Sequence, residues 1–91
     1  MKYEIVPSNQ FKTDLKLAQK RGYDLDKIKK VLTALANGET LEAKYRDHLL
    51  TGDYGGYREC HIQPDWLLVY QIYGDQLILF LARTGAHSDL F

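Results

Sequence analysis

The chain has 91 residues, equal numbers of basic and acidic side chains (12 Lys and Arg, 12 Asp and Glu) and 45% hydrophobic residues. This length predicts a single domain over residues 1–91 with one modest core, and the apolar content excludes a disordered tail. The longest apolar runs are too short to cross a membrane, and no signal peptide is evident. Cys60 is the only cysteine, which excludes an intramolecular disulfide and favours a reducing compartment. We therefore expect a cytoplasmic protein with no membrane partner.

The charges are unevenly distributed along the chain. Residues 1–46 carry ten Lys and Arg against six Asp and Glu (+4), whereas residues 47–91 carry two against six (−4). The basic half offers a surface for a polyanion, and all three histidines lie in the acidic half. A solvated helical face would show the same charge pattern, so charge alone leaves this alternative open.

Two amphipathic helices follow a short β-prone stretch at residues 3–6. Ser8 is suited to cap a helix that runs to about Arg21, and Asp24 a second helix that ends near Asn37. Few residues join them, which predicts an antiparallel helix hairpin. The expected largely buried residues, on these helices and on the strands after them, are Phe11, Leu15, Ile28, Leu32, Val69 and Phe80.

The second half of the chain is typical of a β-meander. Residues 39–54 lack periodicity and predict an irregular loop, and strands are expected at 57–62, 66–73 and 76–84. The last strand is apolar on both faces, which favours a central position. The order β-α-α-β-β-β predicts an α+β fold with the helices on one face of a mostly antiparallel sheet of about four strands.

The three histidines lie at loop edges and strand ends, together with an aspartate and an arginine. His48, His61, Asp65, Arg83 and His87 form this set, which we expect to line one cleft. Any one histidine taken alone is more often an ordinary loop or surface residue. No two of them have the compact spacing of zinc ligands, so we predict no metal site.

The same inventory suits RNA cleavage without a metal. Histidines and a carboxylate can take a proton from the 2′-hydroxyl and give one to the leaving 5′-oxygen. The planar fork of Arg83 matches phosphate oxygens, and an aromatic ring, Trp66 or Phe91, can stack on a splayed base.

Several segments resemble the YafQ-type toxins of the RelE/ParE superfamily, from bacterial type II toxin–antitoxin systems. They are residues 61–66 (His-Ile-Gln-Pro-Asp-Trp), residues 83–87 (Arg-Thr-Gly-Ala-His) with the terminal Leu-Phe, and the pair Asp47-His48 before a glycine-rich turn. The resemblance covers essentially the whole chain. Ala86 and Leu49 depart from the pattern, in which Thr or Ser and Pro are common.

The resemblance implies a RelE-like fold and a ribosome-dependent endoribonuclease that cuts mRNA in the A site without a cofactor. It also implies a cognate antitoxin encoded next to the toxin, with DNA bound only through the antitoxin complex. By match to the motif, the functional set is His48, His61, Asp65, His87 and Phe91.

Roles for these residues follow from their chemistry. We expect His87 to be the general acid, Asp65, with help from His61, to activate the 2′-hydroxyl, and Arg83 to hold the phosphate. His48 would assist proton transfer or orient the substrate. Phe91 would pack on a base or fix the tail. For docking to the ribosome we expect the basic residues Lys12, Lys16 and Lys20.

Two other kinds of protein remain open at this point. The first is a non-catalytic, ParE-like toxin that shares the fold and binds a protein target. The second is an idle partner in a DNA-binding repressor complex, against which the neutral charge argues.

Overall fold

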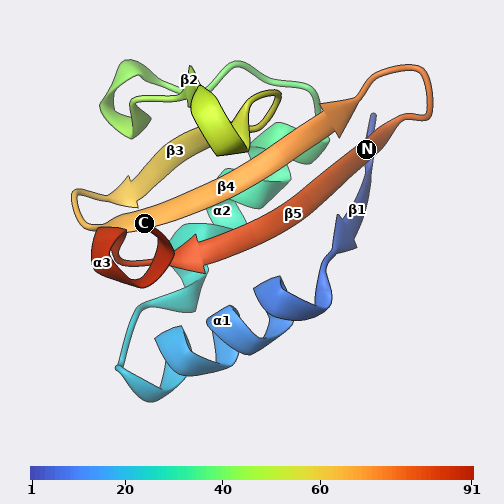
Figure 1. Ribbon diagram of the computed structural model, residues 1–91. Helices are drawn as coiled ribbons and strands as arrows, with labels where there is room; N and C mark the ends of the chain where they lie inside the picture. Colours follow the sequence, from blue (N-terminus) through green and yellow to red (C-terminus); the bar gives the residue numbers. More distant parts are fainter.

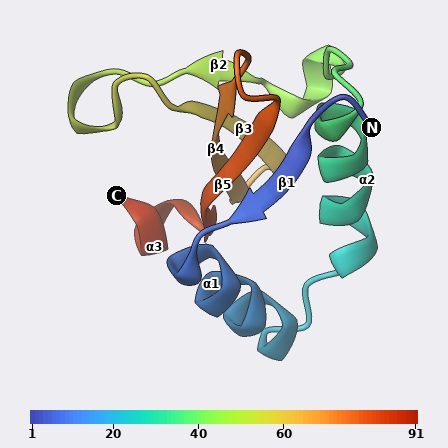
Figure 2. The same cartoon turned by 90° about the vertical axis from the view of Figure 1, so that its right-hand side faces the viewer.

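The computed structural model describes all residues, 1–91, as a five-stranded sheet with two helices on one face (Figures 1 and 2). The elements in order are β1 (Glu4–Pro7), α1 (Asn9–Lys20), α2 (Leu25–Ala36), η1 (Ala43–Tyr45), β2 (His48–Leu49), η2 (Gly52–Tyr54), β3 (Arg58–Gln63), β4 (Trp66–Tyr73), β5 (Ile78–Gly85) and α3 (His87–Leu90). None of the helices has the length and apolar character that spanning a membrane requires.

The strand order across the sheet is β1-β5-β4-β3-β2. β1 runs parallel to β5 and the other neighbours are antiparallel, which confirms the predicted α+β class and mostly antiparallel sheet. β2 was not predicted, because only two residues of the supposed loop pair with β3. The central strand is β4 rather than β5, since Trp66 to Tyr70 are buried on both of its faces.

Both helices begin where their capping residues predicted. Ser8 Oγ accepts the Phe11 N–H at 2.9 Å, and Asp24 Oδ1 accepts the Asp26 N–H at 3.0 Å. α1 lies along β5, and α2 stands closer to β3 (Figure 2). The helix hairpin is therefore held more by the sheet than by contact between its two helices.

The main core lies between the helices and the sheet, and a smaller one lies on the opposite face. Of the residues predicted to be largely buried, Phe11, Ile28 and Val69 are buried. The other three, Leu15, Leu32 and Phe80, are only partly buried. Leu15 and Leu32 pack against the main core from α1 and α2, whereas Phe80 lies between the core residues Leu79 and Leu81 on β5 and therefore points to the opposite face. A domain this small cannot cover every apolar position.

Cys60 points into the main core, and its neighbour His61 points to the other face, as alternation along a strand requires. Burial, with the nearby charges of Asp47 and Glu59, raises the pKa of the Cys60 thiol to about 12. The thiol therefore stays protonated at neutral pH, which argues against a nucleophilic role.

Candidate functional site

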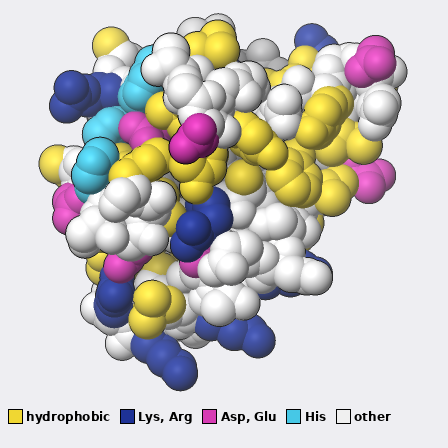
Figure 3. All heavy atoms as spheres, viewed as in Figure 1, with side chains coloured by type: hydrophobic (Ala, Val, Ile, Leu, Met, Phe, Trp, Pro, Cys, Tyr) yellow, Lys and Arg dark blue, Asp and Glu magenta, His cyan; other side chains and the backbone are white.

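The histidine side chains gather along one edge of the molecule (Figure 3). His48 lies on β2, His61 on β3, and His87 at the first position of α3. β3 is the outermost long strand, and α3 follows the end of β5 at the same end of the sheet as the β3–β4 turn (Figure 1). The topology thus brings together residues that are 39 positions apart in sequence, from 48 to 87.

A buried carboxylate sits between two of the histidines. Glu59 Oε1 lies 3.5 Å from His48 Nε2 and 3.7 Å from His61 Nε2, and the two imidazole centroids are 6.3 Å apart. The Glu59 side chain is 8% exposed, against 49% for His48. Glu59 pairs with His48 across the β2–β3 ladder and precedes His61 by two residues, so all three share one face.

Backbone carbonyls fix the orientation of both rings. His48 Nδ1 lies 2.7 Å from the Arg46 carbonyl oxygen, and His61 Nδ1 lies 3.1 Å from that of Pro64. A carbonyl oxygen can only accept, so each Nδ1 must carry the hydrogen of that bond. Each Nε2, on the Glu59 side, is then the atom that can take or give a proton.

The short strand that carries His48 is anchored by its neighbour Asp47. The Tyr70 hydroxyl donates to Asp47 Oδ1 at 2.6 Å, and Arg58 Nη2 donates to Oδ2 at 3.0 Å. Burial and the Asp47 charge raise the pKa of Tyr70, so the hydroxyl remains a donor. Asp47 thus ties the segment before β2 to β3 and β4, and so sets where His48 lies.

The second part of the site is the start of α3. Asp65 Oδ1 accepts the backbone N–H of His87 at 3.0 Å, which places Asp65 beside His87. Asp89 accepts the Ala86 N–H at 3.0 Å and binds Arg21 at 2.7 Å. These bonds hold a four-residue helix that would not form alone.

Aromatic contacts connect α3 to η2, in the loop after β2. The His87 and Phe91 rings are 5.2 Å apart, and the Phe91 and Tyr54 rings are 5.3 Å apart at 74°. Phe91 is 52% exposed, so one side of its ring is open to a partner. Tyr54 was not predicted, because the contact joins two irregular segments.

Trp66 does not stack on a substrate base, contrary to the prediction. It is 1% exposed, its indole N–H donates to Thr84 Oγ1 at 2.9 Å, and its ring packs edge-on against Tyr23 at 4.9 Å. Trp66 is the first residue of β4, and its ring packs into the main core on the helix side of the sheet. Burial of so large an aromatic surface stabilises the fold.

Arg83 is held by an aspartate of α1. Its Nε donates to Asp14 Oδ2 at 2.8 Å, and its Nη2 donates to Asp14 Oδ1 at 3.2 Å. Asp14 also accepts the Thr84 N–H at 3.2 Å. Burial by itself raises the pKa of Asp14, but hydrogen bonds from Arg83, Gln10 and Thr84 outweigh it and lower the pKa below 3.8.

We expect Asp14→Asn to lower the free energy of unfolding at pH 7 by about 1–3 kcal/mol, because charge-assisted bonds to a nearly buried carboxylate are lost. The folded-state pKa of Asp14 is depressed. The contribution of Asp14 to the free energy of unfolding is therefore fully present at pH values above its unfolded-state pKa, near 3.8. This contribution is lost as the pH falls through its lower folded-state pKa. Urea unfolding across this range measures the difference between wild type and variant, with the exposed Asp75→Asn as the matched control. A difference that does not shrink below pH 3.8 would contradict the assignment.

The five predicted residues do not line one cleft. His48 meets His61 through Glu59, and Asp65 meets His87, but Arg83 turns toward Asp14 on α1. The prediction assumed an enclosed site, whereas a sheet this small presents them along an open edge. Among the five, only His61 borders a cavity.

The three predicted docking lysines are all exposed and lie on α1, away from the histidines: Lys12, Lys16 and Lys20. Basic side chains gather over that helix in Figure 3. No group of three or more His, Cys, Asp or Glu side chains is arranged to hold a metal ion.

Comparison with known proteins gives the same family as the motifs. The family model for the bacterial toxin YafQ of type II toxin–antitoxin systems matches residues 3–91. The mRNA interferase toxin YafQ of Escherichia coli K12 is 46% identical over 89 residues, covering 97% of this chain and 95% of that protein. A crystal structure of metal-bound toxin from Helicobacter pylori superposes with a TM-score of 0.92 at 47% identity, covering 98% of this chain and 99% of that one. A crystal structure of the E. coli DinJ–YafQ complex contains a chain that superposes with a TM-score of 0.89 at 43% identity, covering 98% of each chain.

The fold and its histidine edge define a toxin of RelE-like architecture. The chain belongs to the YafQ family of bacterial type II toxins, as the resemblance predicted.

Proposed function

We propose that this YafQ-family toxin is a ribosome-dependent endoribonuclease that cuts mRNA in the A site by metal-free acid–base chemistry. The observation that carries the proposal is the convergence of two sets of proton-transfer residues and one exposed aromatic ring on one edge of the sheet. These groups are the His48–Glu59–His61 cluster, the Asp65–His87 contact and the open ring of Phe91. The E. coli relatives named as mRNA interferases support the substrate class.

The cluster around Glu59 serves as the base in this proposal. His61 Nε2 takes the proton of the 2′-hydroxyl, and the 2′-oxygen attacks the adjacent phosphorus. Glu59, 3.7 Å from His61 Nε2, stabilises the resulting imidazolium, and His48 can share the proton through the same carboxylate. Asp65 shifts from base to positioning residue, because one of its oxygens already holds the His87 backbone.

His87 serves as the acid. Its ring gives a proton to the leaving 5′-oxygen as the bond from phosphorus to that oxygen breaks. Asp65 fixes the backbone of His87, and Phe91 packs on the ring at 5.2 Å, so the imidazole has a defined place. The exposed side of Phe91 is available for a base.

Arg83 supplies positive charge to the phosphate. Asp14 engages one edge of its guanidinium with two hydrogen bonds, which leaves the remaining donors of the five for phosphate oxygens. An arginine fixed before the substrate binds needs little reorganisation in the transition state.

The ribosome supplies the substrate in a reactive geometry. The toxin has an open edge rather than a channel, so a codon held stretched in the A site would give what the toxin lacks. Lys12, Lys16 and Lys20, on the exposed side of α1, are suited to contact ribosomal RNA. The structures of E. coli DinJ–YafQ complexes support an antitoxin partner, because this chain matches a chain of those complexes over nearly its whole length.

Mapping of transcript 5′ ends after controlled expression tests the proposal. We expect new ends confined to translated regions and in frame with codons, and suppression by co-expression of the neighbouring antitoxin gene. Growth arrest without new 5′ ends would favour the non-catalytic, ParE-like alternative. Equally fast cutting of naked mRNA would refute ribosome dependence.

A further inference from the structure

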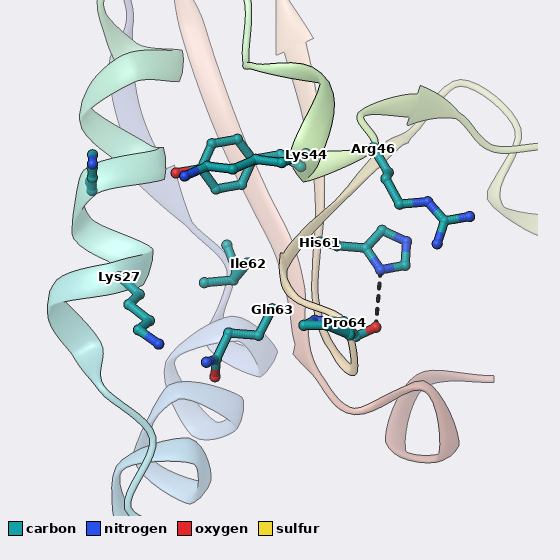
Figure 4. A pocket seen from close by; sticks show the side chains of 9 residues that line it. Lys27, Lys44, Arg46, His61, Ile62, Gln63 and Pro64 are labelled. Atoms are coloured by element: carbon teal, nitrogen blue, oxygen red, sulfur yellow. Dashed lines mark hydrogen bonds between the residues drawn. The ribbon is translucent and has the colours of Figure 1, made fainter.

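A basic hollow lies directly beside the histidine edge. It has a volume of about 480 Å³ and opens between α2, η1 and the end of β3 (Figure 4). This volume is within the roughly 300–1,000 Å³ of small-ligand sites, which is enough for a nucleotide-sized group. Four basic residues line it, Lys27, Lys30, Lys44 and Arg46, together with Tyr45 and His61.

The hollow results from the shortness of β2. This strand pairs only with Arg58 and Glu59, so β3 has no neighbouring strand beyond Glu59 on its outer side. The turn of η1 packs there instead, and the space between η1 and α2 stays open. Basic residues of the N-terminal half thus reach the strand that carries His61.

The charge in the hollow is uncompensated. No carboxylate lies within 4.0 Å of Lys27, Lys30, Lys44 or Arg46. The other three arginines, in contrast, each bind an aspartate: Arg21, Arg58 and Arg83. Of the acidic residues near η1 in sequence, Glu39 and Glu42 line a neighbouring hollow that shares Lys30 and Tyr45 with this one, and Asp47 is bound by Arg58 and Tyr70.

Arg46 joins the hollow to the histidines. It is left-handed (φ 51, ψ 41), a conformation that is rare for a residue with a long side chain. In this conformation its carbonyl oxygen accepts from His48 Nδ1 at 2.7 Å. Figure 4 shows its guanidinium beside the His61 ring, with Lys27 reaching from α2 on the other side of the hollow.

We infer that this basic hollow binds the sugar-phosphate backbone of the substrate RNA next to the bond that is cut. The inference rests on the proposed endoribonuclease function and deepens it. His61 belongs to both the hollow and the Glu59 cluster. An RNA chain whose reacting phosphate lies at His61 extends away from it in two directions, 5′ and 3′, and the hollow lies along one of them. The Arg46 fork and the lysine ammonium groups suit phosphate oxygens without selecting a base.

RNA fits this surface better than an acidic protein segment does. Seven of the nine residues that line this hollow are basic or polar, and four of them carry a Lys or Arg charge that a phosphate can neutralise. Its position against a proton-transfer residue also requires an occupant that reaches the reacting bond. The two basic surfaces then divide the work. The lysines of α1 contact the ribosome, and the hollow holds the message.

Binding of a short RNA with a 2′-O-methyl group on every nucleotide tests the inference, because this RNA cannot be cleaved. We compare Lys27→Gln/Lys44→Gln with Lys2→Gln/Lys29→Gln, which removes the same charge from exposed positions outside the hollow. The first variant is expected to weaken binding roughly five- to tenfold for every RNA sequence and to reduce the salt slope by about 0.7 for each phosphate that is no longer neutralised. The control is expected to bind like wild type.

Arg46→Gly removes the guanidinium where the fold is most easily kept, because glycine adopts a positive φ without steric cost. It is expected to weaken RNA binding with no loss of thermal stability. Three results would overturn the inference: equal weakening in the control variant, no salt-sensitive RNA binding by wild type, or tighter binding of a ten-residue glutamate peptide than of RNA.

Failure of this inference is distinguishable from failure of the proposed function. If the toxin cleaves mRNA on ribosomes but the substitutions in the hollow leave its RNA affinity unchanged, only the proposed role of the hollow is wrong. Binding through the hollow with no cleavage anywhere would overturn the endoribonuclease and leave the binding surface standing.

Discussion

Replacing His87 with alanine is expected to slow single-turnover cleavage of ribosome-bound mRNA by roughly 10²–10⁴-fold, the range for a lost general acid. Ribosome binding is expected to persist, because the docking lysines lie on α1, away from α3. The backbone N–H of position 87 keeps its bond to Asp65 in the variant, so the loss reports on the imidazole and not on the position of α3. Rapid-quench cleavage alongside a ribosome-binding assay measures both quantities.

Ser88→Ala is the matched control for His87→Ala. Ser88 is the next residue of α3, it is exposed, and no hydrogen bond holds its side chain. Cleavage by this variant at the wild-type rate would show that α3 tolerates a small truncation. Wild-type cleavage by His87→Ala, or loss of binding instead of cleavage, would show that His87 is not the acid.

The parts of the fold that follow from local sequence were predictable. Ser8 and Asp24 cap the helices they were expected to cap, since capping depends on residues three or fewer positions apart. The strand at 66–73 was predicted to the residue, because an aromatic and β-branched run between two turns has few alternatives.

The contacts that shape the site are long-range, and the sequence did not reveal them. Asp14 meets Arg83 across 69 positions, and Asp47 meets Tyr70 across 23. Asp14 does not stand out in sequence, since an acidic residue on a helix is usually solvated, and Asp47 stood out only through its place beside His48 in the family pattern. The burial of Trp66 likewise depends on the Thr84 hydroxyl, 18 residues away.

Glu59 is different, because a signal for it was present. It precedes His61 by two residues in a predicted strand, and alternation places such residues on one face. The missing information was that β2 exists at all. Without β2, nothing in the sequence indicated that His48 would lie opposite Glu59 in the ladder.

Glu59→Gln is expected to slow single-turnover cleavage by roughly 10²-fold, toward the lower end of acid–base effects, while ribosome binding stays unchanged. The amide keeps the shape of the side chain but removes the negative charge that lies 3.5 and 3.7 Å from the two Nε2 atoms. Neither imidazole can then share its proton through a carboxylate. Glu4→Gln, at an exposed position of β1, is the matched control for loss of one acidic charge.

A comparison of multiple variants tests whether Glu59 acts through the two rings. If it does, adding Glu59→Gln to His48→Ala/His61→Ala costs almost nothing further, because groups that act as a unit are strongly non-additive. A full additional loss of roughly 10²-fold in the triple variant would instead place Glu59 in direct contact with the substrate. Because Glu59 is nearly buried, thermal unfolding of each variant must accompany the rates. If the loss of cleavage rate in Glu59→Gln is explained by a matching loss of folded protein, Glu59 has no role in the chemical step, and the two histidines act without it.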